Sequence, residues 1–149
     1  MKQKKKITLN LAKILSLEVE IGGLKNQQTG ETVLKGLLSH KIPMPTKFKL
    51  KILHNTILNI KKANDEIREE LIKEYGTEVN GGISIAMFVD AEAEVKEYNP
   101  NYIEFAKKME ELLAKEIEIE FEEIVIDEFK EINEEDVYPT FWDLLIEAV

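Results

Sequence analysis

Cysteine is missing from this chain of 149 residues, and histidine, arginine and proline are scarce, with two, one and four copies. Without cysteine there are no disulfides, no thiolate metal sites and no thiol nucleophiles, as is usual in a reducing compartment. His40 and His54 have no companion ligands at the spacing of a metal site. We therefore expect neither a metal nor another cofactor.

Long apolar runs are also missing. No segment approaches the length that spans a bilayer, and Thr8, Asn10 and Lys13 interrupt the apolar residues near the start, which makes a poor signal peptide. We expect a cytoplasmic protein that does not act at a membrane. The chain is 44% hydrophobic and 33% charged, which is enough apolar material for one folded domain over residues 1–149.

Positive and negative charges are separated along the chain. Residues 1–63 hold thirteen Lys and three Glu, a net charge of +10, whereas residues 64–149 hold seven basic and twenty-six acidic residues, a net charge of −19. Such asymmetry is typical of surfaces that bind partners or other copies of the same chain.

The first six residues carry four of the lysines and are predicted to form a flexible basic tail. Clustered lysines can bind phosphate by releasing counterions. Here the total charge of −9 and the absence of arginine and aromatic residues from the cluster argue against nucleic acid as the partner.

The clearest pattern is a heptad-like seam of apolar residues that Asn64 alone interrupts. It consists of Leu50, Leu53, Ile57, Ile60, Ile67 and Leu71. This spacing predicts a helix over residues 47–75, with Thr46 as N-cap and Gly76 just beyond its end. The seam is either part of the domain's own core or a coiled-coil-like contact with another helix or another copy. Asn64 either sets the register of such a contact or lies at a solvated edge.

The remaining patterns predict an α+β fold in which the long helix pairs with a second helix beside a small antiparallel hairpin or sheet. The expected elements are a helix passing into a short strand over 7–24, a short helix over 31–39, a hairpin with arms 77–79 and 83–87, a helix over 99–114, a strand over 115–121 that Ile124 and Ile126 extend after a bulge, and a C-terminal helix over 140–148. The row of glutamates on the strand is expected to oppose edge-to-edge pairing.

No motif predicts catalysis. Ser39 and His40 are adjacent, so on a helix their side chains would point about 100° apart and could not form a dyad. The many carboxylates fall on polar faces, and the two Gly-Gly pairs lack the context of a phosphate loop. We predict a protein that is not an enzyme. The candidate interaction residues are Asn64, Phe141, Trp142, Leu144, Leu145 and Ile146.

Three segments carry a resemblance to a known group of proteins. They are LLSHKIPMPTKFKLKILHNTILNIKKANDEIREELIKEYG, MEELLAKEIEIEF and IVIDEF. In this order, with a turn after the first, they resemble small proteins of unassigned role encoded by tailed bacteriophages. The resemblance covers roughly Leu37 to Phe129 and brings no catalytic residues. It implies a phage origin and a role in particle assembly.

Three functional hypotheses follow. The leading one is a phage-encoded structural or assembly-associated protein, in the host cytoplasm or the virion, that binds a virion component or itself as a homo-oligomer. The alternative is a host-directed inhibitor, such as an acidic mimic of DNA that blocks a defence protein. The third, a hydrolase, would need two of the carboxylates to lie together in a cleft.

Overall fold

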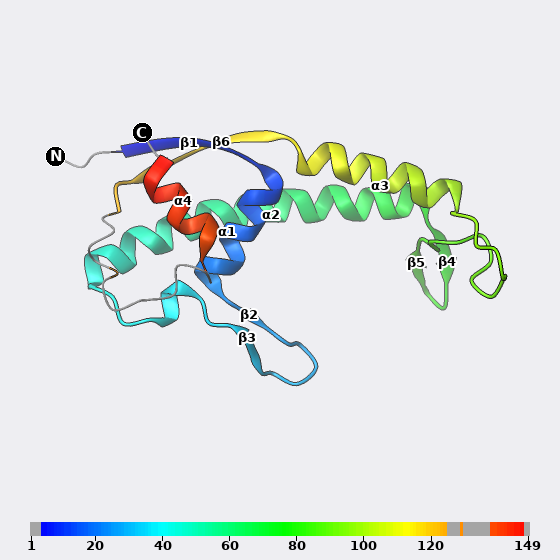
Figure 1. The fold of residues 1–149 in the computed structure, drawn as a ribbon, viewed down its shortest axis with the longest axis horizontal. Coiled ribbons are helices and arrows are strands. Elements are labelled where there is room, and N and C mark those ends of the chain that lie inside the picture. The colour runs from blue at the N-terminus through cyan, green and yellow to red at the C-terminus, as the bar shows by residue number, and fades with distance from the viewer. Residues whose placement is uncertain (1–3, 125–128, 130–137, 148–149) are drawn as a thin grey trace. The chain divides into compact units, whose positions relative to one another are not determined.

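The structure, a computed structural model, describes residues 4–124, 129 and 138–147, with side chains up to residue 144 (Figure 1). The chain divides into two compact units, and a single domain over residues 1–149 stays a prediction. Unit 1 comprises Met1–Ile60 and Glu116–Val149, and unit 2 comprises Lys61–Lys115.

Helices and short antiparallel strands confirm the predicted α+β class. In chain order the elements are β1 (Lys4–Asn10), α1 (Leu11–Gly22), β2 (Leu24–Lys25), β3 (Thr32–Leu34), the 3-10 turn η1 (Leu37–Ser39), α2 (Met44–Tyr75), β4 (Thr77–Val79), β5 (Gly82–Ser84), α3 (Pro100–Leu113), β6 (Glu116–Glu122) and α4 (Pro139–Glu147). The strands form three two-stranded sheets, β1 with β6, β2 with β3, and β4 with β5.

Strands β1 and β6 come from opposite ends of the chain and form an antiparallel ladder along their whole length. Ile7 lies opposite Ile119, and Lys4 lies opposite Glu122. Because side chains alternate between the two faces of a strand, the apolar positions of both strands share the buried face. Lys4 and Lys6 of β1 and the glutamates of β6 therefore share the other face, whereas Lys5 lies on the same face as Ile7.

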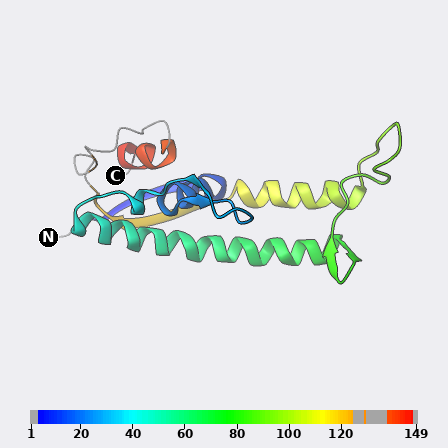
Figure 2. The ribbon, with the colours of Figure 1, turned by 90° about the horizontal axis from the view of Figure 1, so that it is seen from below.

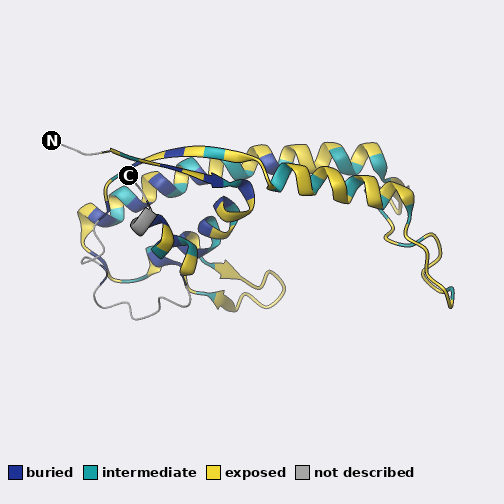
Figure 3. Cartoon of the chain, turned by 45° about the horizontal axis from the view of Figure 1, so that its top comes forward, coloured by how far each residue is buried: buried dark blue, intermediate teal, exposed yellow. Residues whose placement is uncertain are grey.

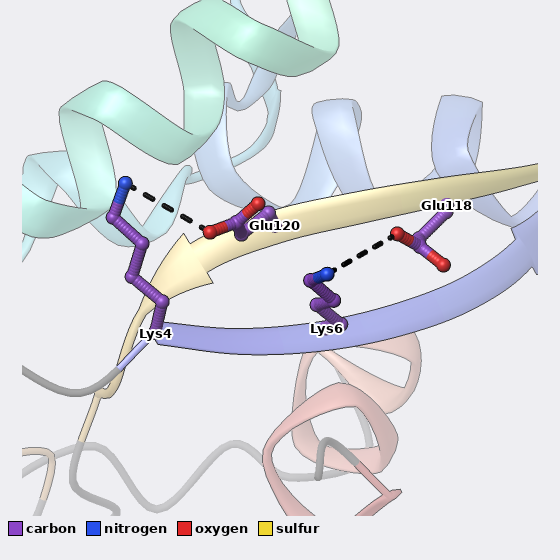
Figure 4. Close-up of polar contacts among 4 residues, drawn as sticks. All are labelled: Lys4, Lys6, Glu118 and Glu120. Atoms are coloured by element: carbon purple, nitrogen blue, oxygen red, sulfur yellow. Dashed lines mark ion pairs between the residues drawn. The ribbon is translucent and has the colours of Figure 1, made fainter.

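This ladder corrects one prediction, since Lys4 and Lys6 belong to β1 and not to a flexible tail. The glutamates of β6 lie beside a strand that carries lysines, and their expected effect against edge-to-edge pairing with other chains stays a prediction. Lys4 pairs with Glu120 at 3.8 Å and Lys6 with Glu118 at 3.9 Å (Figure 4). Part of the charge separation in the sequence is thus neutralised within unit 1.

The first helix follows this strand, whereas we predicted a helix that passes into a strand. The Asn10 side chain accepts a hydrogen bond from the backbone N–H of Lys13 at 2.8 Å, which fixes the start of α1. Ile14, Leu17 and Ile21 are buried at helical spacing, so the apparent alternation near residue 20 belongs to a helix. The helix predicted over 31–39 is also wrong, since this segment forms β3 and η1.

The core of unit 1 gathers apolar residues from β1, β6, α1, η1, α4 and the first part of α2. The α2 residues in this core include Leu50, Leu53 and Ile57, which are the first three positions of the predicted seam. Helix α2 begins at Met44 rather than at residue 47, and Thr46 is buried in its first turn instead of capping it. Proline is tolerated in a first turn, which explains why Pro45 does not delay the start. Ile124 is buried beyond the end of β6, and Ile126 lies outside the described residues.

Unit 2 contains the end of α2, the β4–β5 hairpin and α3. Asn80 and Gly81 have φ values of 50° and 83°, as a two-residue hairpin turn of type I′ requires, which confirms the hairpin, although its second arm ends at Ser84. Asn99 caps α3, and Pro100 occupies its first turn, as predicted. Within the unit, α3 runs antiparallel alongside the end of α2 (Figures 1 and 2).

Candidate functional site

Unit 2 has no buried apolar side chain, although the structure describes all of residues 61–115. Every buried apolar residue among the described ones belongs to unit 1, and α3 has no buried residue at all. In Figure 3 the dark blue of buried residues marks β1, α1 and the first part of α2, whereas α3 is teal and yellow. The large apolar residues of unit 2 that are exposed are Ile67, Val79, Ile83, Met87, Val89, Val95, Tyr98 and Ile103.

The most exposed of these residues lie on the loop of residues 86–99, between β5 and α3. Val95 is 82% exposed and Val89 is 66% exposed. Backbone hydrogen bonds close the loop, from the Val89 N–H to the Glu97 carbonyl and from the Asn99 N–H to the Met87 carbonyl, both at 2.9 Å. The loop therefore holds its apolar side chains in a defined arrangement.

Aromatic rings lie at the base of this loop. The ring centroids of Phe88 and Tyr98 are 5.2 Å apart, and Tyr98 stacks on Tyr102 at 6.4 Å with an angle of 12° between the rings. The Lys96 ammonium lies 5.3 Å from the centre of the Phe88 ring. Tyr98 is 57% exposed, and exposed tyrosines of this kind are enriched in protein–protein interfaces.

Acidic side chains are also exposed on unit 2. Residues 61–115 hold thirteen acids and eight bases, a net charge of −5, and every acid except the half-buried Asp65 is exposed. Four of the acids, Asp90, Glu92, Glu94 and Glu97, lie on the 86–99 loop. A partner for unit 2 should therefore offer apolar and basic groups together.

Asn64 is buried, with 6% of its surface exposed, so it does not lie at a solvated edge. No donor among the described residues lies within hydrogen-bonding distance of its side-chain oxygen. A buried acceptor left unsatisfied costs about 1–3 kcal/mol. A role for Asn64 in setting register stays a prediction.

The candidate interaction residues of α4 that the structure describes pack within unit 1, and a role for them in binding a partner stays a prediction. Phe141 and Leu144 are buried in the core of unit 1, and Trp142 packs its ring against Phe141 with a centroid distance of 5.7 Å. They hold α4 against its own unit, because the helix is apolar on nearly every side. The side chains of Leu145 and Ile146 lie outside the described residues.

Sequence reasoning missed the polar groups that anchor α4. Glu20 of α1 is buried and accepts hydrogen bonds from the backbone N–H groups of Phe141 at 2.9 Å and Thr140 at 3.3 Å. It thereby satisfies donors at the start of α4. Its position three residues after the buried Leu17 is the signal that could have placed it in the core.

Two further contacts tie distant segments of unit 1 together. Tyr138 is fully buried, and its hydroxyl donates to the carbonyl of Lys35 and lies 2.9 Å from Nε2 of His40. The ring of His54 packs directly against Gly22, where a Cβ atom would lie 2.6 Å from Nε2. Burial lowers the pKa of His54, and the Glu18 carboxylate acts in the opposite direction. Both histidines thus serve packing in the described structure.

Among the described residues no group of three or more His, Cys, Asp or Glu side chains could hold a metal ion. In the same part of the chain, no helix combines the length and apolar composition needed to cross a bilayer. A hollow of about 580 Å³ lies beside the β2–β3 hairpin. Its polar lining includes Lys25, Lys35 and Ser39, without a carboxylate or histidine that could act with the serine.

Comparison of the chain with models of known protein families, with curated proteins and with solved structures finds no match.

Proposed function

We propose that this chain is a non-enzymatic binding protein that acts through protein–protein contacts made by unit 2. Its role is structural or assembly-associated, as its resemblance to tailed-bacteriophage proteins implies. The partner is a virion component or a second copy of the chain, in the host cytoplasm or in the virion.

One observation carries this proposal: residues 61–115 bury no apolar side chain. A large apolar side chain contributes about 1.5–3 kcal/mol when it is fully removed from water. Unit 2 gains little of this stabilisation by itself, and its closed 86–99 loop presents valine and tyrosine side chains to solvent. A partner that covers this surface supplies the missing burial.

The test compares two sets of exposed apolar residues. The first variant combines Val89→Ser, Val95→Ser and Tyr98→Ser in unit 2, and its matched control combines Leu24→Ser and Val33→Ser in the β2–β3 hairpin of unit 1. We expect the wild type and the control to self-associate or to co-sediment with phage particles or their precursors. The unit 2 variant should lose this association while remaining folded, which its melting curve checks.

A wild-type protein that stays monomeric and is absent from particles and their precursors would refute the proposal. Equal association of the two variants would show that unit 2 is not the binding surface.

The exposed acids of unit 2 favour the second candidate, an acidic mimic of DNA that inhibits a host protein. Because the glutamates of β6 face lysines, unit 2 would have to carry the mimicry. Such a protein should displace DNA from a host nuclease or defence protein, with an affinity that falls as salt rises. Failure to recover any such host protein with the purified chain, at low salt, would count against this function.

A further inference from the structure

Helix α2 carries a second apolar stripe on the side opposite the core of unit 1. We define it as the α2 stripe, and its members are Met44, Phe48, Ile52 and Leu58. Steps of four residues keep the first three on one side of a helix, and 100° per residue places them roughly opposite Leu53 and Ile57. Met44 is 76% exposed and Phe48 is 60% exposed.

The surroundings of the α2 stripe are basic. Residues 32–60 contain five lysines and no acid. Lys47 and Lys51 border the stripe, and Lys51 is exposed. Lys49, by contrast, donates to the backbone carbonyl of Glu123 at 3.0 Å and belongs to the packing of unit 1.

We propose that the α2 stripe binds the acidic, apolar surface of unit 2 in a second copy of the chain. This inference rests on the proposed function and names its partner. The two surfaces are complementary in charge, since residues 32–60 are purely basic and residues 61–115 carry a net −5. Both present exposed apolar groups, Phe48 and Ile52 on the stripe and Val89 and Val95 on the loop.

An anionic membrane is the other surface that a basic, apolar helix face can bind. The acids of unit 2 and the total charge of −9 oppose it, because the chain as a whole would be repelled by anionic lipid. Two copies of net charge −9 also repel one another as a whole, but their contact pairs the basic stripe with an acidic surface, whereas a membrane would offer its anionic charge to the acids of unit 2 as well. The two surfaces of the contact differ, so the contact is heterologous, and repeated copies close into a ring or continue as an open chain.

A charge swap tests the inference in the full-length protein. The stripe variant combines Lys47→Glu and Lys51→Glu, and the loop variant combines Glu94→Lys and Glu97→Lys. An acid at position 47 lies near the start of α2, where it suits the helix dipole, and position 51 is exposed, so the stripe variant should fold. By sedimentation equilibrium, the mass of the wild type should rise with concentration, and each variant alone should associate at least about tenfold more weakly.

An equal mixture of the two variants should associate as the wild type does, because each reversed surface then meets an oppositely charged one. Phe48→Ser should weaken association of the wild type, whereas Val33→Ser, outside the stripe, should not. Melting curves of all variants establish that they are folded.

Four results would overturn the inference. They are a wild type that stays monomeric, stripe variants that associate normally, a mixture that is not restored, and binding to phosphatidylserine vesicles without self-association. A fifth result would separate this inference from the proposed function. If the unit 2 serine variant loses association and the stripe variant does not, unit 2 is still the binding surface, but the α2 stripe is not what it binds.

Discussion

Replacing Glu20 by alanine should release the start of α4 from unit 1. Glu20 is 5% exposed, and its carboxylate accepts hydrogen bonds from two backbone N–H groups of α4, at 2.9 and 3.3 Å. Loss of a helix cap costs about 0.5–2 kcal/mol, and a hydrogen bond to a charged group contributes about 1.5–3 kcal/mol. Relief from burying a carboxylate offsets part of this loss. We expect Glu20→Ala to lower the free energy of unfolding by about 2 kcal/mol.

The single tryptophan provides the assay. Trp142 lies in α4, with ring centroids 5.9 Å from Phe129 and 5.7 Å from Phe141, so its fluorescence reports whether α4 stays packed. With a denaturant dependence of about 2 kcal/mol per molar urea, the midpoint should fall by about 1 M. Glu20→Gln keeps an acceptor oxygen and should lose roughly half as much stability.

The matched control is Glu18→Ala, on the same helix, since the hydrogen bonds to the start of α4 are made by Glu20 and not by Glu18. Its midpoint should shift by less than about 0.3 M urea. Equal midpoints for the alanine variants at positions 18 and 20 would refute the argument that a buried carboxylate caps α4.

Three further predictions concern the packing of unit 1. Gly36→Ala should destabilise the protein by about 1–3 kcal/mol and lower its melting temperature, because the new Cβ would lie 2.4 Å from the backbone of the Gly-Gly pair that ends α1. The control is Gly82→Ala, whose Cβ would meet nothing closer than 3.9 Å, and it should leave the melting temperature nearly unchanged. In β1, Ile7→Ala should lower the free energy of unfolding by about 2–4 kcal/mol, because it leaves a cavity in the core. Lys6→Ala should lower it by less than about 1 kcal/mol, because it breaks only an exposed ion pair. Equal losses for the two variants in urea unfolding would contradict this ranking. Burial keeps the pKa of His54 in the folded protein below its ordinary 6.5, so protonation of His54 favours the unfolded state. The free energy of unfolding that depends on neutral His54 should be fully present above pH 6.5. It should decrease as the pH falls from 6.5 to the pKa of the folded state. His54→Gln should flatten this part of the curve of unfolding free energy against pH, and an unchanged curve would rule out the contribution.

Local patterns predicted the elements whose shape depends on neighbouring residues. The seam marked the long helix, Asn80 and Gly81 marked the hairpin turn, and Asn99 with Pro100 marked the start of α3. Spacing along a helix, positive φ and capping all act within a few residues. These features are therefore readable without knowledge of the fold.

The first strand was misread because strand pairing is not a local feature of the chain. Its alternation spans only Ile7 and Leu9 after a run of lysines, and a strand has no stabilising ladder until another strand pairs with it. Only the fold brings β6 beside β1 and turns the lysine run and the glutamate row into two halves of one sheet.

For the candidate surfaces, too, the sequence predicted some features and only the structure showed the others. The sequence showed that charge is separated along the chain and that α2 and α3 are amphipathic, because composition and period are properties of the chain itself. It did not show that unit 2 buries no apolar residue or that α2 exposes a second stripe.

The sequence by itself determined the class of the fold and most of its helices, since these arise from interactions between residues close in the chain. Tertiary structure alone decided that Glu20 caps a helix 120 residues away, that lysines of β1 neutralise β6, and which apolar faces stay exposed. Burial depends on which distant segments meet, and no local period specifies that partner.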